Sequence, residues 1–193
     1  DAHFAGGDYA AAIGHYQRAL QAGRASGLPF IQATALCGLG TAHIDISSKL
    51  MDQTSQYNAQ ALELMESPLG TVTGGLAWAD LGFCALAAGN IDQASQFFEK
   101  GLTVSTAFKF LARPLLLAGS AFVALGRNDA ATAGALVQEA QEFADERAMK
   151  HFYPLLSLAH AQVLLAAGDP GGALESFNRA DDLAVEMGMR PLS

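Results

Sequence analysis

The sequence is poor in proline, in charge and in long apolar runs. Six prolines among 193 residues, with abundant alanine and no β-branched runs, favour helix along the whole chain. With 51% hydrophobic and only 16% charged residues, the chain is too apolar to be disordered. No apolar stretch reaches 18 uncharged residues, so we expect neither a membrane-spanning helix nor a membrane partner.

Positive charge is also scarce. The chain has 11 Lys and Arg against 19 Asp and Glu, which gives a net charge of −8 at pH 7. An acidic surface does not attract the phosphates of nucleic acids or of anionic lipids. The composition therefore argues against a direct nucleic-acid partner.

The two cysteines, Cys37 and Cys84, form no C-x-x-C pair. No histidine stands at a zinc-site spacing from either of them. Two such thiols are no disulfide framework, so we expect both to be free, buried and kept in a reducing compartment. The expected location is therefore the cytoplasm.

A large apolar residue recurs just after five helix-like stretches, at Leu28, Leu69, Phe108, Met149 and Met189. The separations between these positions are 41, 39, 41 and 40 residues. A fixed period near 40 residues indicates stacked supersecondary units. The predicted fold class is therefore all-α, a solenoid of antiparallel helix pairs.

A second marker lies inside each unit. Leu36, Leu39, Gly40 and His43 fall along one face of a helix. Their spacing aligns without gaps on Trp78, Leu81, Gly82, Ala85 and Gly89, on Leu115, Ala118, Gly119, Phe122 and Gly126, and on Ser157, His160, Ala161, Leu164 and Gly168. The terminal glycine is interpreted as the turn residue that ends each first helix.

About nine helices follow from these markers. First helices are expected over residues 30–46, 71–88, 110–125 and 150–167, and second helices over 8–26, 51–67, 90–107, 128–147 and 170–187. The best second helix carries a small Ala94 and, four residues later, an aromatic Phe98.

Two second helices fit this pattern poorly. In the unit at 48–66, Asp52 and Gln56 occupy the small and the aromatic positions. Either the register slips by one, with Tyr57 and Ala61 in use, or the helix packs differently. In the unit at 126–147, Ala135 occupies the aromatic position and Leu136 comes one residue late.

These residues resemble tetratricopeptide repeats. Trp78, Leu81, Gly82, Ala94 and Phe98 match the family pattern closely. The family period is roughly 34 residues, and the longer period here is similar to arrays in kinesin light chains and in bacterial LuxR-type and ATPase-linked signalling proteins. The resemblance implies a right-handed superhelix.

The resemblance covers essentially the whole chain, so we expect a single repeat domain over residues 1–193. Residues 1–6 read as the end of a helix, and residues 190–193 read as the start of another. Both ends cut through a unit, which predicts a fragment of a larger protein.

In such arrays the first helices line a concave groove. The resemblance places it at Thr34, Cys37, Thr41, Leu76, Ala79, Phe83, Arg113, Leu116, Ser120, Leu155, Leu158 and Gln162. These residues are mostly apolar, so the expected partner is a protein or peptide, either an amphipathic helix or an extended segment. Alternatively, they pack on each other or on a flanking domain.

Other polar residues are interpreted as structural, with no role in catalysis or metal binding. His3 and His43 share one repeat position and His160 occupies another, so we expect packing between helices and no metal site. The acidic run at 139–146 is interpreted as a solvated face. We expect no catalytic residue, no cofactor and no enzyme activity.

The main functional hypothesis is therefore a protein-interaction scaffold within a regulatory or signalling protein. One alternative is a sensory domain that binds a small molecule or short peptide and changes the solenoid's curvature. The other is an architectural spacer, which could act through a homodimer.

Overall fold

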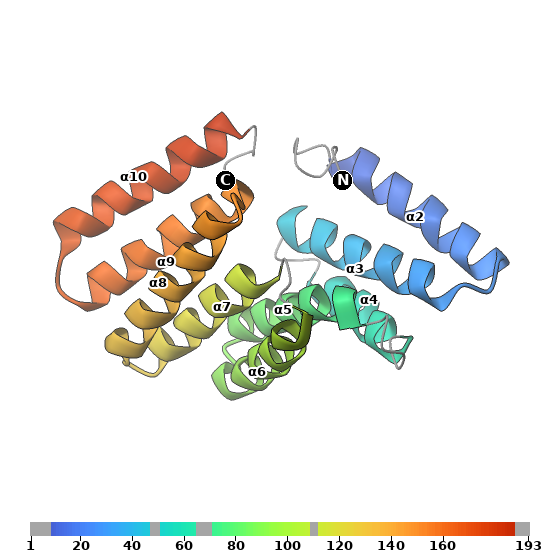
Figure 1. Cartoon of the computed structure of the whole chain (residues 1–193), viewed down its shortest axis with the longest axis horizontal. Coiled ribbons are helices and arrows are strands. Elements are labelled where there is room, and N and C mark those ends of the chain that lie inside the picture. Colours follow the sequence, from blue (N-terminus) through green and yellow to red (C-terminus); the bar gives the residue numbers. More distant parts are fainter. Residues whose placement is uncertain (1–8, 47–50, 65–70, 109–111, 188–193) are drawn as a thin grey trace. The chain divides into compact units, whose positions relative to one another are not determined.

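The computed structural model describes residues 9–46, 51–64, 71–108 and 112–187, and these residues fold as helices and turns with no strand (Figure 1). In this part of the chain there are nine α-helices and one short 3₁₀-helix, η2. Their bounds are α2 Tyr9–Ala25, α3 Pro29–Ile46, α4 Met51–Glu63, α5 Thr71–Ala87, α6 Ile91–Phe108, α7 Arg113–Gly126, α8 Ala130–Glu146, η2 Lys150–Phe152, α9 Tyr153–Ala166 and α10 Pro170–Glu186. The all-α prediction is confirmed.

Proline marks where several of these helices begin. Pro29 and Pro170 are the first residues of α3 and α10, and Pro114 and Pro154 are the second residues of α7 and α9. Proline suits these positions because the first N–H groups of a helix have no partner within it. It also explains why α7 and α9 begin three residues later than the sequence pattern predicts.

The chain divides into two compact units at Ala112 and Arg113. Unit 1 holds α2 to α6, and unit 2 holds α7 to α10. In each unit every helix contacts the next one along the chain. Successive first helices also touch each other: α3 touches α5 in unit 1, and α7 touches α9 in unit 2. Contacts confined to near neighbours are those of a helical solenoid. The single domain and the right-handed superhelix stay predictions.

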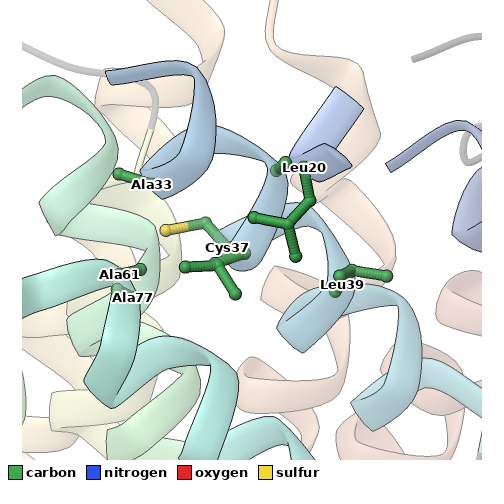
Figure 2. Packing of buried hydrophobic residues seen from close by; sticks show 8 residues of the cluster. Leu20, Ala33, Cys37, Leu39, Ala61 and Ala77 are labelled. Carbon is green, nitrogen blue, oxygen red and sulfur yellow. The ribbon is translucent and has the colours of Figure 1, made fainter. Parts of the chain in front are cut away.

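Small side chains fill part of the core of unit 1. Figure 2 shows Cys37 between Ala33 and the pair Ala61 and Ala77, which come from α4 and α5. All four residues are buried. Alanine at these positions lets the helices approach closely, and Leu20 of α2 closes the same cluster.

Glycines accept the large side chains of neighbouring helices. A β-carbon at Gly82 would overlap the ring of Phe98, and one at Gly40 would overlap the amide of Asn58. Asn58 lies 40 residues before Phe98, so the two residues occupy the same position in successive units.

This equivalence corrects the register of α4. Thr54 and Asn58, both fully buried, occupy the small and the aromatic positions, two residues later than the prediction of Asp52 and Gln56. The slip by one residue is wrong as well, because Tyr57 is only half-buried. The second helix therefore fits the repeat with polar residues at its buried positions.

The turn between α7 and α8 corrects a second register. The left-handed turn residue is Asn128, with φ 60°, where the other units have Gly89 and Gly168. The N–H of Asp129 donates to the Ala124 carbonyl at 2.9 Å, as that of Asp169 does to Leu164. Gly126, predicted as the turn, is instead the last residue of α7. Asparagine adopts this conformation more readily than other side chains, because its short polar group bonds locally.

Moving the turn by two residues also resolves α8. Its small and large buried positions become Ala133 and Val137, 39 residues after Ala94 and Phe98. The prediction that Ala135 stands in the aromatic position is therefore wrong. The side chain of Asp129 caps α8 by accepting from the Thr132 N–H at 3.0 Å.

Candidate functional site

The candidate site consists of the predicted groove positions on the first helices, and it is described separately for each unit. On α5, Leu76 and Phe83 are half-buried, and Ala79 between them is fully buried. Phe83 leans on α6, with its ring centre 5.3 Å from that of Phe98 in an edge-to-face arrangement.

On α3 the predicted positions show a similar alternation. Thr34 is exposed, Cys37 is buried and Thr41 is half-buried. The Thr34 hydroxyl donates to the Phe30 carbonyl at 2.9 Å. Phe30 itself is 50% exposed one helical turn before Thr34 and was not predicted, although its position on the same helix face is readable from the sequence.

On α7 the corrected register changes the residues of the face. The positions that follow Leu76, Ala79 and Phe83 by 39 residues are Leu115, Ala118 and Phe122. Leu115 and Phe122 are half-buried and Ala118 is fully buried, which repeats the pattern of α5.

The residues predicted on α7 are engaged elsewhere. Leu116 is fully buried, and the Ser120 hydroxyl donates to the Leu116 carbonyl at 3.0 Å. Arg113 forms an ion pair with Glu139 of α8, and its guanidinium lies 5.8 Å from the ring centre of Phe143. The register shared with α5 therefore favours Leu115, Ala118 and Phe122 over these three predicted residues as the positions of the face on α7.

On α9 the prediction keeps its register, since Leu155, Leu158 and Gln162 follow the corrected α7 positions by 40 residues. Leu155 and Leu158 are half-buried and Gln162 is exposed. We call the half-buried and exposed members of these sets in each unit, with Phe30 added in unit 1, the first-helix face of that unit. In unit 1 they are Phe30, Thr34, Thr41, Leu76 and Phe83, and in unit 2 they are Leu115, Phe122, Leu155, Leu158 and Gln162.

A buried polar cluster lies directly behind this face in unit 1. The Thr41 hydroxyl donates to Asp80 Oδ2 at 2.8 Å, and Asn58 Nδ2 donates to the same oxygen at 3.2 Å. Asp80 is only 2% exposed. The Thr54 hydroxyl donates to the Gly40 carbonyl at 3.1 Å. The cluster therefore links α3, α4 and α5 through polar side chains, whereas most buried positions carry apolar ones.

Both cysteines are free and buried, as predicted. Burial, with a smaller contribution from the nearby Asp80, raises the pKa of Cys37 to about 12. Burial also raises the pKa of Cys84, against a hydrogen bond with Ser55 that lowers it. A thiol kept neutral in this way is a poor nucleophile, so neither cysteine has the properties of a reactive site.

Two of the described histidines, His43 and His160, contact a neighbouring helix. The Leu39 carbonyl lies 2.6 Å from His43 Nδ1, and the His43 ring centre lies 5.3 Å from that of Tyr57 in α4. His160 Nδ1 lies 3.0 Å from the Ser176 hydroxyl oxygen of α10. His3 lies outside the described residues. Within those residues, no three His, Cys, Asp or Glu side chains gather closely enough to hold a metal ion.

The acidic run on α8 is exposed, as predicted. Glu142 accepts from Gln138 at 2.9 Å, and Asp145 accepts from Tyr153 of α9 at 2.7 Å. The hydrogen bonds from Tyr153 and Gln141 hold the pKa of Asp145 below its ordinary value. These carboxylates accept hydrogen bonds from neighbouring side chains and are exposed to solvent, so a structural role accounts for them.

A shallow depression of about 410 Å³ lies between α4, α5 and α6. Its walls include Met51, Ser55, Cys84, Asn90 and Phe97. None of the predicted site residues lines it, so it is a feature separate from the first-helix face.

A comparison with models of known protein families finds none that matches this chain, and a comparison with curated proteins finds no match either. The tetratricopeptide resemblance therefore rests on the residues of the chain itself. None of the described helices combines the length and the hydrophobicity needed to cross a membrane.

Proposed function

We propose that the chain is a protein-interaction scaffold, and that the first-helix face of each unit binds an apolar peptide segment. One observation carries the proposal: Leu76, Ala79 and Phe83 on α5 recur as Leu115, Ala118 and Phe122 on α7, with the same residue types and the same burial. Half-buried leucine and phenylalanine side chains on a rigid helix offer apolar contacts at little conformational cost.

The buried polar cluster supports this proposal in unit 1. Thr41 belongs to the first-helix face, and its hydroxyl is held by Asp80 of the next first helix. Hydrogen bonds between α3, α4 and α5 hold these three helices in place in the absence of a partner. A preorganised surface binds more tightly because less freedom is lost on binding.

The same proposal assigns the chain to the tetratricopeptide-like arrays of regulatory proteins in a reducing compartment. The pairing of Gly82 with Phe98 and the two free buried cysteines support these assignments.

The test starts from a displayed library of random 15-residue peptides selected on the whole chain. Selected peptides are then titrated by calorimetry into the native chain and into Leu76→Glu and Leu115→Glu variants. Leu28→Glu is the matched control, because Leu28 is 48% exposed in the turn before α3 and lies outside the face.

We expect enriched peptides with apolar residues. Each peptide should bind about tenfold or more weakly to the face variant of the unit that holds it, and the control should leave its binding unchanged. Circular dichroism of every variant checks that the helices persist. A library that yields no enriched peptide, or peptides that bind both face variants as well as the native chain, would contradict the proposal.

A further inference from the structure

The first-helix face of unit 1 carries two hydroxyl groups on α3 where α5 carries apolar side chains. Thr34 and Thr41 stand seven residues apart, about two helical turns, so they share one side of α3. Forty-two residues later, α5 carries Leu76 and Phe83 at the equivalent positions. The face of unit 1 is therefore polar along α3 and apolar along α5.

The hydroxyl of Thr41 has its only proton engaged. Its oxygen lies 2.8 Å from Asp80 Oδ2 and 3.1 Å from the carbonyl oxygen of Cys37, and both of these atoms are acceptors. A hydroxyl has one proton and two lone pairs, and a carboxylate is the stronger acceptor of the two. Thr41 is half-buried. It therefore offers a partner the lone pairs of its oxygen and no proton.

The hydroxyl of Thr34 is engaged in a similar way. It donates to the Phe30 carbonyl at 2.9 Å, and the Thr34 side chain is exposed. Both hydroxyl groups of the face therefore act as acceptors toward a partner. A partner has to place a donor opposite them, because two facing acceptors would leave both polar groups without a hydrogen bond.

A negative charge lies directly behind Thr41. Asp80 stands four residues after Leu76 and three before Phe83, so the three share one side of α5. Asp80 itself is only 2% exposed. After burial, its charge is the next contribution that raises the pKa of Cys37 to about 12. Salt screens a buried charge weakly, so the Thr41 oxygen lies in a negative potential.

Unit 2 differs at the positions equivalent to Asp80. They hold Gly119 on α7 and Ala159 on α9, and neither residue carries a charge. The α7 position equivalent to Thr41 holds Phe122. The face of unit 2 is therefore an internal comparison without the hydroxyl and without the carboxylate behind it.

We propose that the first-helix face of unit 1 binds a peptide segment that carries a lysine or arginine among its apolar residues, and that Thr41 determines this preference. Lysine and arginine side chains are positively charged and have several N–H donors and no acceptor. They match both the acceptor hydroxyl and the negative potential behind it, whereas both would repel a carboxylate. This specificity rests on the proposed function, because it belongs to the same face.

The test takes its probes from the displayed library, as the selected peptides whose binding Leu76→Glu weakens. Each peptide is titrated by calorimetry into the native chain and into Thr41→Val, which keeps the shape of the side chain and removes the hydroxyl. Each lysine or arginine of the peptide is then replaced in turn by norleucine, which is apolar and has no charge and no donor in its side chain.

Thr103→Val on α6 is the matched control. The Thr103 hydroxyl donates to the Glu99 carbonyl at 2.9 Å, and its side chain is exposed, as at Thr34. Thr103 belongs to unit 1 but lies on a second helix, outside the first-helix face. It therefore reports the effect of losing a helix-surface hydroxyl without a change in the face.

We expect lysine or arginine more often in these peptides than in those that Leu115→Glu weakens. One of the norleucine replacements should weaken binding to the native chain about tenfold, because a hydrogen bond to a charged group is lost. The same replacement should weaken binding to Thr41→Val by no more than about threefold, since the acceptor is already absent. Thr103→Val should respond as the native chain does, and circular dichroism checks the helices of each variant.

Two outcomes would overturn this specificity and leave the proposed function in place. One is a set of Leu76-dependent peptides with no excess of lysine or arginine over the Leu115-dependent set, a comparison that does not require Thr41→Val to fold. The other is a norleucine replacement with the same effect on the native chain and on Thr41→Val. A library without any Leu76-dependent peptide would refute the proposed function in unit 1, and the preference with it.

Discussion

Thr41 of α3 and Asp80 of α5 are 39 residues apart in the chain and are joined by a 2.8 Å hydrogen bond. Asn58 of α4 donates to the same carboxyl oxygen, so one side chain links three helices of unit 1. Asn58 Oδ1 is buried and has no hydrogen-bond partner among the described residues. The cluster thus depends on Asp80 to satisfy its donors.

Replacing Asp80 with alanine should lower the free energy of unfolding by about 1–3 kcal/mol, because the buried Asn58 amide and the half-buried Thr41 hydroxyl lose this acceptor. The exposed Asp182→Ala change on α10 is the control and should have little effect. Urea denaturation measures both. Combining Asp80→Ala with Thr41→Val should cost less than the sum of the single changes, and simple additivity would argue against a direct bond.

The contact between Gly82 and Phe98 predicts a size limit. Gly82→Ala should destabilise the chain by about 1–3 kcal/mol, since the new methyl group overlaps the Phe98 ring. Unit 2 shows the compensated pair, with Ala121 and Val137 at the equivalent positions. Adding Phe98→Val should therefore recover part of the loss caused by Gly82→Ala. If thermal denaturation shows that the second change always adds to the damage, the equivalence is wrong.

The turn at Asn128 makes a prediction about register. Asn128→Ala should cost roughly 1 kcal/mol, because alanine tolerates a φ of 60° poorly, whereas Asn128→Gly should be neutral or stabilising. Gly126→Ala should stabilise the chain by about 0.5–1 kcal/mol, since Gly126 is helical and exposed. The opposite ranking in chemical denaturation would return the turn to Gly126.

The Cys37 thiol predicts a loss of stability at high pH. Its pKa is raised from 9.0 to about 12 in the folded chain, so the unfolded chain releases its proton first as pH rises. The contribution of the neutral thiol is complete below about pH 9 and is lost progressively between about pH 9 and 12.

Between pH 8 and pH 10 this thiol alone should remove about 1 kcal/mol from the free energy of unfolding. The measurement is urea unfolding of the native chain and of Cys37→Ala at both pH values. The native chain should lose about that much more than the variant. Equal losses would mean that Cys37 ionises in the folded chain as it does when unfolded.

The sequence predicts the helices well because their signals are local. Apolar spacing, proline at helix starts and turn residues such as Gly89 and Gly168 each act within a few neighbouring positions. The error in the register of α7 also has a local cause. Glycine is the usual residue of such a turn, so the pattern selects Gly126, although the asparagine at 128 can adopt the same left-handed conformation.

The composition of the core around α4 could not be predicted in this way. Polar residues such as Thr54 and Asn58 are not expected at buried positions. Asn58 is accommodated there because Asp80, in another helix, accepts its hydrogen bond. Similarly, spacing alone does not show that Ala79 is buried while Leu76, on the same helix, is half-buried. Such distinctions depend on how helices distant in the chain pack against each other.

The central claim is that the first-helix face binds an apolar peptide segment, and Leu115 tests it most directly because only the structure assigns it to that face. The measurement is the dissociation constant of a library-selected peptide for Leu115→Glu, relative to the native chain. The account predicts an increase of about tenfold or more, with helicity unchanged. If no selected peptide shows a changed dissociation constant for Leu115→Glu or for Leu76→Glu, the account is contradicted.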